Sequence, residues 1–84
     1  AQALLANIAG LYAVFHGPNG LRAIGSRVHA LTVLLETQLR TLGLRQRNPH
    51  YFDTLRVDGA DPVAVRRLAE AAAINLRYRG DGSI

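Results

Sequence analysis

The chain has 84 residues, ten arginines, no lysine, and a formal net charge of +4 at pH 7. It contains no cysteine, which excludes disulfides and cysteine-ligated zinc sites. Because it has no lysine amine, no side chain can form a Schiff base with a carbonyl compound. A domain of this length buries only roughly 60% of its unfolded surface, so we expect a small core.

Residues 1–15 are the first predicted element, a helix that is apolar on every side. Only Gln2 and Asn7 have side chains that favour water. Such a helix must be covered all round, yet a membrane span needs about 20 residues. No N-cap residue precedes it. We therefore expect the chain to be a piece of a larger cytoplasmic protein that covers this helix.

A break follows at residues 16–20, His-Gly-Pro-Asn-Gly. Gly17 can adopt the left-handed conformation that closes a helix, and Pro18 suits the first turn of the next one. Leucine and valine then recur at spacings of three, four and seven, which predicts a long second helix ending at Gly43.

The pattern changes after this second helix. The polar residues 45–50, which include a proline, predict a loop, and the aromatic and β-branched residues 51–57 predict a strand. Asp61 followed by Pro62 is typical of a helix start, with a capping carboxylate and then proline in the first turn. This third helix is expected to run to about Ala73.

Residues 74–79 alternate between apolar and polar side chains, which predicts a second strand with Tyr78 facing the core. Residues 80–82 predict a turn into a further strand that has barely begun at Ile84. We therefore expect an α+β fold in which a helical hairpin-like pair precedes a strand–helix–strand layer. Residues 18–84 would form the small α+β domain, truncated at its C-terminal hairpin.

No group of residues predicts an active site. His16, His29 and His50 include no pair at i,i+4 and have no carboxylate at ligand spacing, so no metal site is expected. Ser26 and Ser83 lack the sequence context of a hydrolase nucleophile. We assign no catalytic, cofactor-binding or metal-ligating residue.

Two further features bear on charge. Asp53 is the one carboxylate in the predicted strand at residues 51–57, and we expect it to pair with an arginine across the sheet. The arginines on either side of Tyr78 are also typical of a nucleic-acid-binding surface. An RNA-binding sheet needs two or three exposed aromatic side chains, whereas Tyr78 is in phase with Ile74 and Leu76 and should face inward.

Six blocks, AQALLAN, YAVFHGPNGLRAI, RVHALT, YFDTLRV, INLR and DGSI, resemble the glycine cleavage system P-protein family, in order and along essentially the whole chain. The likeness is to the small C-terminal domain of the first of the family's two homologous halves. It implies part of the small domain of a bacterial fold-type-I pyridoxal-phosphate enzyme, with residues 1–17 as an interdomain helix that is normally buried on the large domain. Gly25 departs from the family, which usually has alanine at this position.

The resemblance implies an oxidoreductase of glycine catabolism that decarboxylates glycine with pyridoxal phosphate and passes the aminomethyl group to the lipoyl H-protein. The family's Schiff-base lysine lies in the other half of the full protein. The chain alone is therefore expected to hold no cofactor and to be inactive. The expected partners are the lipoylated H-protein, the other half of the P-protein, and a second copy of this chain through helix 1–15.

Two alternatives remain open at this point. One is an autonomous α/β protein-interaction module, although such a module would give its first helix a polar face. The other is an arginine-rich nucleic-acid-binding domain, whose affinity would fall steeply with salt.

Overall fold

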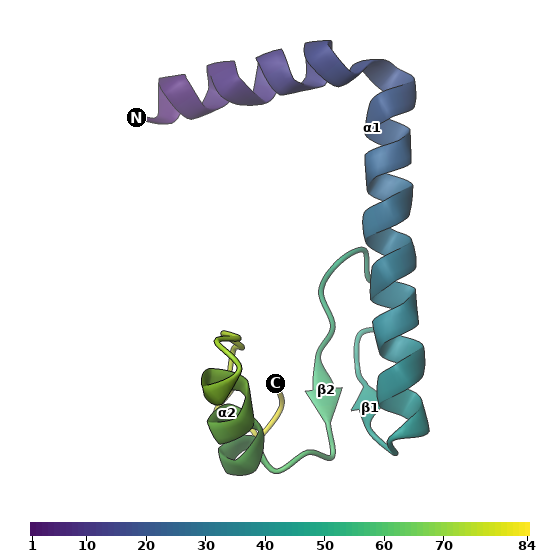
Figure 1. Cartoon of the computed structure of the whole chain (residues 1–84), viewed down its shortest axis with the longest axis vertical. Coiled ribbons are helices and arrows are strands. Elements are labelled where there is room, and N and C mark those ends of the chain that lie inside the picture. Colours follow the sequence, from purple (N-terminus) through teal and green to yellow (C-terminus); the bar gives the residue numbers. More distant parts are fainter.

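The computed structural model describes residues 1–84 and contains two helices and two short strands. Helix α1 (Gln2–Thr41) is followed by β1 (Arg45–Gln46), β2 (Val57–Asp58) and α2 (Pro62–Ala71). The fold is mixed helix and antiparallel sheet, as an α+β fold requires. The strands lie beside the C-terminal part of α1, with α2 beyond them (Figure 1).

Helix α1 is bent at Gly17, whose φ of 68° and ψ of 175° are not helical. We call residues 2–16 the arm and residues 18–41 the shaft. The arm points away from the shaft (Figure 1), so the expected hairpin-like pair is wrong. A helical hairpin needs a connecting loop of about two to five residues. Here a single non-helical residue, followed directly by Pro18, only redirects the chain.

The shaft ends as the sequence predicts. Gly43 has a φ of 81°. Its amide donates to the carbonyl of Arg40 (3.0 Å), and the amide of Leu44 donates to the carbonyl of Leu39 (3.1 Å). These two bonds form a Schellman motif, which needs a residue in the left-handed region and therefore favours glycine.

The sheet pairs β1 with β2 in antiparallel register, Arg45 opposite Asp58 and Gln46 opposite Val57. The strand predicted at residues 51–57 is therefore wrong except at its last residue. The segment expected to be a loop instead supplies β1.

The side chain of Gln46 explains this difference. Its Nε2 donates to the carbonyl of Asn48 (2.7 Å), and its Oε1 accepts from the amides of Asn48 (2.6 Å) and Arg56 (3.2 Å). Local bonds from a side chain to the backbone compete with strand pairing. They hold residues 48–56 as a loop closed at its base.

Helix α2 begins at the predicted position. The carboxylate of Asp61 accepts from the amide of Val63 (3.1 Å), and proline occupies the first turn. The helix ends at Ala71, two residues before the predicted end, because Ala73 adopts a φ of 58°. The amide of Ile74 then donates to the carbonyl of Ala69 (2.8 Å), closing a Schellman motif without glycine.

The predicted strand at residues 74–79 does not form. The free edge of β2 is taken by Ile84, whose amide and carbonyl both bond to Val57 (3.0 and 2.7 Å). The predicted turn at residues 80–82 is confirmed by the bond from the amide of Arg79 to the carbonyl of Ser83 (2.9 Å). Because Ile84 occupies this edge, residues 74–79 have no strand partner for backbone hydrogen bonds.

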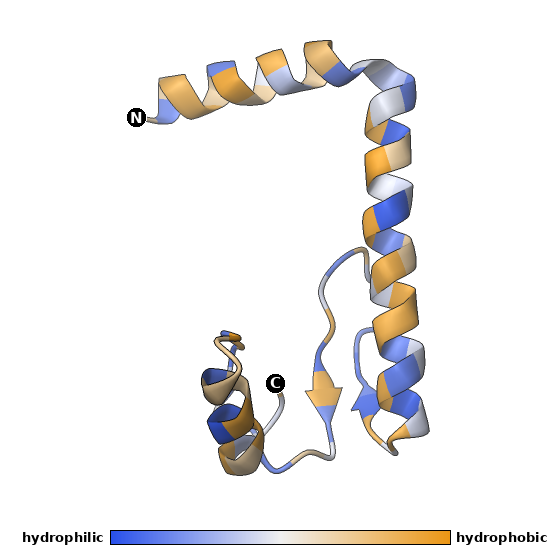
Figure 2. Cartoon of the chain, viewed as in Figure 1, coloured by the Kyte–Doolittle hydropathy of each residue, from blue (hydrophilic) through white to orange (hydrophobic).

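The molecule has almost no core of its own. Only Thr32, Ala69 and Ser83 are buried, whereas eighteen large apolar side chains are exposed. Helix α2 does not pack against α1. Apolar residues lie along the whole arm and along parts of the shaft and α2 (Figure 2).

No helix combines the length and the hydropathy that crossing a membrane requires.

Candidate functional site

The densest set of polar contacts joins the sheet to the C-terminal turn. We call Arg47, Arg56, Asp58, Asp81 and Ser83 the charged cluster. Asp81 is its centre, because one carboxylate oxygen accepts from Arg47 Nη1 (3.1 Å) and also from Arg56 Nη2. Arg47 Nε lies 3.2 Å from Asp58, and Arg56 Nε donates to the hydroxyl of Ser83 (2.9 Å).

The other carboxylate oxygen of Asp81 closes the turn itself. It accepts from the hydroxyl (2.6 Å) and from the amide (3.0 Å) of Ser83. These two bonds, followed by the attraction of Arg56, hold the pKa of Asp81 well below its usual range. The cluster therefore keeps Asp81 ionised and fastens the C-terminal turn to β2.

The hydroxyl of Ser83 is fully engaged within the cluster. The buried hydroxyl of Ser83 already donates to Asp81 and accepts from Arg56, and no histidine contacts it. A serine nucleophile needs an adjacent base, so the sequence-based rejection of Ser83 as a nucleophile agrees with the geometry.

The pairing expected for Asp53 is wrong. Its carboxylate accepts only from the neighbouring hydroxyl of Thr54 (3.0 Å). Asp58 and Asp81 pair with the arginines instead. The sequence carried one usable signal for Asp81: an aspartate two residues before a serine in a glycine-containing turn is typical of a side chain that caps its own turn.

The histidines lie among aromatic rings. Nδ1 of His29 is 2.9 Å from the carbonyl of Phe52, and the two rings are stacked with centroids 6.2 Å apart. In the arm, the ring of His16 lies 4.3 Å from that of Tyr12 and 5.1 Å from that of Phe15. No three potential metal ligands gather anywhere in the chain.

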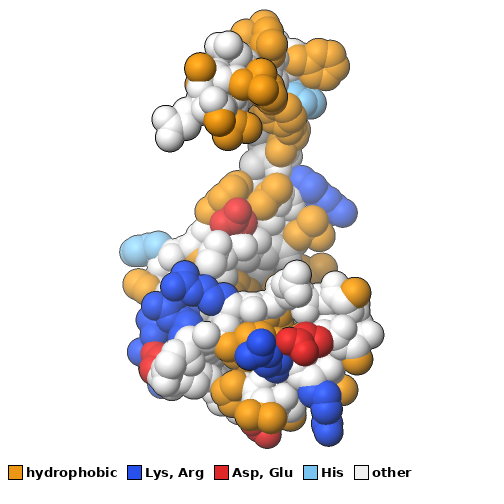
Figure 3. Space-filling view, turned by 90° about the vertical axis from the view of Figure 1, so that its left-hand side faces the viewer, with side chains coloured by type: hydrophobic (Ala, Val, Ile, Leu, Met, Phe, Trp, Pro, Cys, Tyr) orange, Lys and Arg blue, Asp and Glu red, His pale blue; other side chains and the backbone are white.

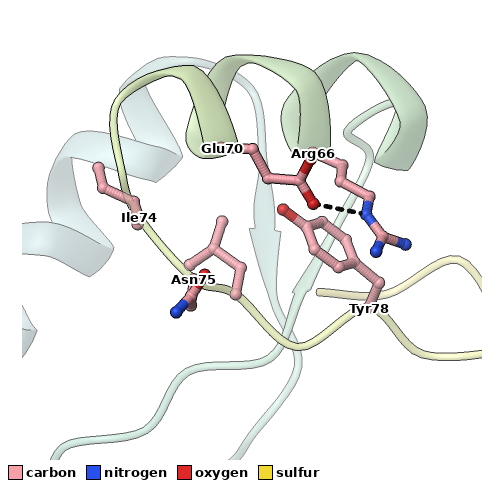
Figure 4. A pocket seen from close by; sticks show the side chains of 6 residues that line it. Arg66, Glu70, Ile74, Asn75 and Tyr78 are labelled. Atoms are coloured by element: carbon pink, nitrogen blue, oxygen red, sulfur yellow. Dashed lines mark hydrogen bonds and ion pairs between the residues drawn. The ribbon is translucent and has the colours of Figure 1, made fainter.

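Tyr78 is partly buried beside α2, in the inward direction that the sequence predicts. It lines a cavity of about 210 Å³ together with Arg66, Glu70 and Asn75 (Figure 4). The guanidinium of Arg66 lies 5.3 Å from the centre of the Tyr78 ring and pairs with Glu70 (2.9 Å). The hydrogen bond and charge of Glu70 raise the pKa of Arg66. Because the guanidinium of Arg66 lies over the ring, that face of Tyr78 is not free to stack on a base.

The flanking residues do not complete the predicted apolar face. Ile74 is 51% exposed and Leu76 is 43% exposed. Both residues line the same cavity as Tyr78, as the predicted shared face requires, but they stay exposed because no second layer covers residues 74–79.

The arm carries seven of the eighteen exposed large apolar side chains. Its most exposed side chains include Phe15 (85%), Val14 (81%) and Leu11 (69%). Apolar side chains dominate the arm in space-filling view, whereas charged side chains gather on the body below it (Figure 3). Contiguous apolar surface of this kind marks an interaction site.

Comparison with known proteins agrees with the sequence blocks described above. The family model for the glycine cleavage system P-protein matches residues 1–84. Three similar proteins, each called glycine dehydrogenase (decarboxylating), come from Salmonella paratyphi B, Salmonella newport and Salmonella heidelberg. Each is 58% identical over 77 residues, covering 92% of this chain but only 8% of the relative. This chain belongs to the glycine cleavage system P-protein family.

Proposed function

We propose that this chain is a structural segment of a glycine dehydrogenase (decarboxylating). The enzyme would decarboxylate glycine and transfer the aminomethyl group to the lipoylated H-protein, in the bacterial cytoplasm. The observation that carries the proposal is the family match over all 84 residues. Since the chain spans about 8% of the length of its relatives, the activity belongs to the larger polypeptide.

Pyridoxal phosphate would supply the electron sink for the decarboxylation when bound to the complete enzyme. The residues of this chain do not fit its covalent attachment, because the sequence contains ten arginines and no lysine. The cofactor would therefore be held by the other half of the P-protein, and the contribution of this chain is structural.

The arm would be the interdomain helix, with residues 1–17 buried on the large domain and residues 18–84 forming the small domain of the first half. Support comes from the exposure of the arm on all sides and from the absence of any charged side chain within it. Burial of its apolar surface would stabilise the union of the two domains.

The test is an assay of the complete protein. We expect it to release carbon dioxide from carboxyl-labelled glycine, with a requirement for added pyridoxal phosphate and lipoylated H-protein. Failure to act on glycine under these conditions would contradict the proposal.

The role of the arm is tested in the same assay. Leu5→Glu combined with Leu11→Glu should lower the yield of assembled, active enzyme, because two charges would be buried against the large domain. Asn19→Asp combined with Gln38→Glu is the matched control, with the same added charge at exposed polar positions of the shaft. Equal loss in both variants would contradict the burial of the arm.

A further inference from the structure

A second cavity lies on the opposite side of residues 77–79 from the Tyr78 cavity. Its volume is about 210 Å³, and its polar lining comes from Asn48, Thr54 and three arginines, Arg56, Arg77 and Arg79. Arg77 and Arg79 both line this cavity, whereas Tyr78, which lies between them in the sequence, lines the other one.

Two of these guanidinium groups have no partner. The five ion pairs of the structure use Arg40, Arg47, Arg56 and Arg66. Arg77 and Arg79 accordingly have no carboxylate, and no side-chain hydrogen bond of theirs is formed within the chain.

The charges around the cavity do not cancel. Of the three arginines that line the cavity, Arg56 pairs with Asp81, whereas Arg77 and Arg79 have no ion pair, which leaves two positive charges. Asp81 already accepts from two guanidinium groups, so it offers nothing further to Arg77 or Arg79. The uncompensated positive charge therefore suits this cavity to binding an anion.

The size of the cavity limits what that anion can be. Sites for drug-sized ligands occupy about 300–1,000 Å³, so a cavity of about 210 Å³ fits a single small group rather than a nucleotide. Guanidinium forks match both carboxylate and phosphate. A carboxylate would offset only one of the two uncompensated charges, whereas a phosphoryl dianion offsets both.

We propose that the cavity formed by Arg56, Arg77 and Arg79 is a phosphoryl-binding site, which takes inorganic phosphate or the phosphoryl group of a small phosphate monoester. The site is independent of the proposed glycine dehydrogenase activity. Arg56 is held by its ion pair with Asp81 and by its bond to the hydroxyl of Ser83, which fixes one wall of the cavity before any ligand arrives.

The test is calorimetric titration of the complete protein, saturated beforehand with pyridoxal phosphate so that cofactor-related phosphate sites are filled. The probe is inorganic phosphate. Arg77→Gln combined with Arg79→Gln should weaken the binding by about tenfold or more, since two charge-assisted contacts are lost. Arg27→Gln combined with Arg67→Gln is the matched control, because both arginines are exposed and neither lines the cavity.

Further measurements separate phosphate from other anions. Affinity should rise between about pH 6 and about pH 8, where phosphate loses its second proton, and acetate should not compete. Methyl phosphate distinguishes the two possible ligands. Tighter binding of methyl phosphate than of inorganic phosphate indicates a phosphate monoester, and weaker binding indicates free phosphate.

Asn48→Asp places a negative charge on the cavity wall without altering either arginine and should also weaken phosphate binding. Identical titrations for the wild type and the double variant, or equal competition by acetate, would overturn the proposal.

Discussion

The carboxylate of Asp61 accepts a hydrogen bond from the amide of Val63 at the start of α2. Asp61→Ala should remove about 1 kcal/mol from this helix end. Because the effect is local, hydrogen exchange of the first-turn amides should quicken by about fivefold.

The sequence alone suggests Asp58→Ala as a neutral control in the same turn, but the structure does not support that choice. Asp58 pairs with Arg47, and the contact joins β2 to the charged cluster. Asp53 is the better control, since it contacts only Thr54. If Asp53→Ala changed exchange in α2 as much as Asp61→Ala, the capping assignment would be wrong.

Asp81 gives a pH dependence whose sign follows from its lowered pKa. The folded chain favours the ionised carboxylate more than the unfolded chain does. The resulting stabilisation is therefore present above the ordinary pKa of 3.8 and is lost as pH falls through the lowered folded value. We expect protection of the Ser83 amide to be full well above pH 3.8 and to decline progressively as the pH falls below that value. Asp81→Asn should lower this protection at neutral pH and flatten its acid dependence, and an unchanged profile would contradict the role of the carboxylate.

At the scale of elements, the bend in α1 depends on Gly17. Its φ of 68° and ψ of 175° lie in a region that is essentially restricted to glycine. Gly17→Ala should cost about 1–3 kcal/mol and redirect the arm. Spin labels at Gln2 and Gln38 would report a changed distance distribution. Gly10→Ala, within the arm where an added Cβ meets nothing within 4 Å, should leave that distribution unchanged.

Two substitutions should each stabilise a helix: glycine to alanine within α1, and alanine to glycine at the end of α2. Gly25 is helical with open space around its Cα, so Gly25→Ala should gain about 0.5–1 kcal/mol. Ala73 has a positive φ at the end of α2, so Ala73→Gly should relieve about 1 kcal/mol. Exchange protection near each site measures both effects, and a loss of protection in either variant would contradict the assigned backbone conformation.

At the scale of the whole molecule, the uncovered arm predicts association when the 84 residues are isolated. Sedimentation at micromolar concentration should show a species heavier than the 9.1 kDa monomer, because apolar helices left bare pack against one another. Leu5→Glu with Leu11→Glu should restore the monomer, and Gln2→Glu with Asn7→Asp should not. A clean monomer for the unmodified chain would contradict this prediction.

The sequence predicted those features that depend on a few neighbouring residues. The cap at Asp61, the left-handed glycines at positions 17 and 43, and the turn at residues 80–82 all formed as expected. Each depends on a local backbone preference or a side chain reaching its own turn. The family was also readable from the sequence, because its blocks are contiguous.

The sequence by itself determined the local backbone conformations, the absence of a Schiff-base lysine and the family. Only the tertiary structure decided which segments pair and which charges meet. β2 has two edges, and Gln46 and Ile84 took them, which left residues 74–79 without a strand partner. Asp81 reached Arg47 and Arg56 across more than twenty residues of chain, while Asp53 reached none. Strand pairing and ion pairing join residues that are far apart in the sequence. A local sequence pattern does not indicate which of these distant residues meet in the folded chain.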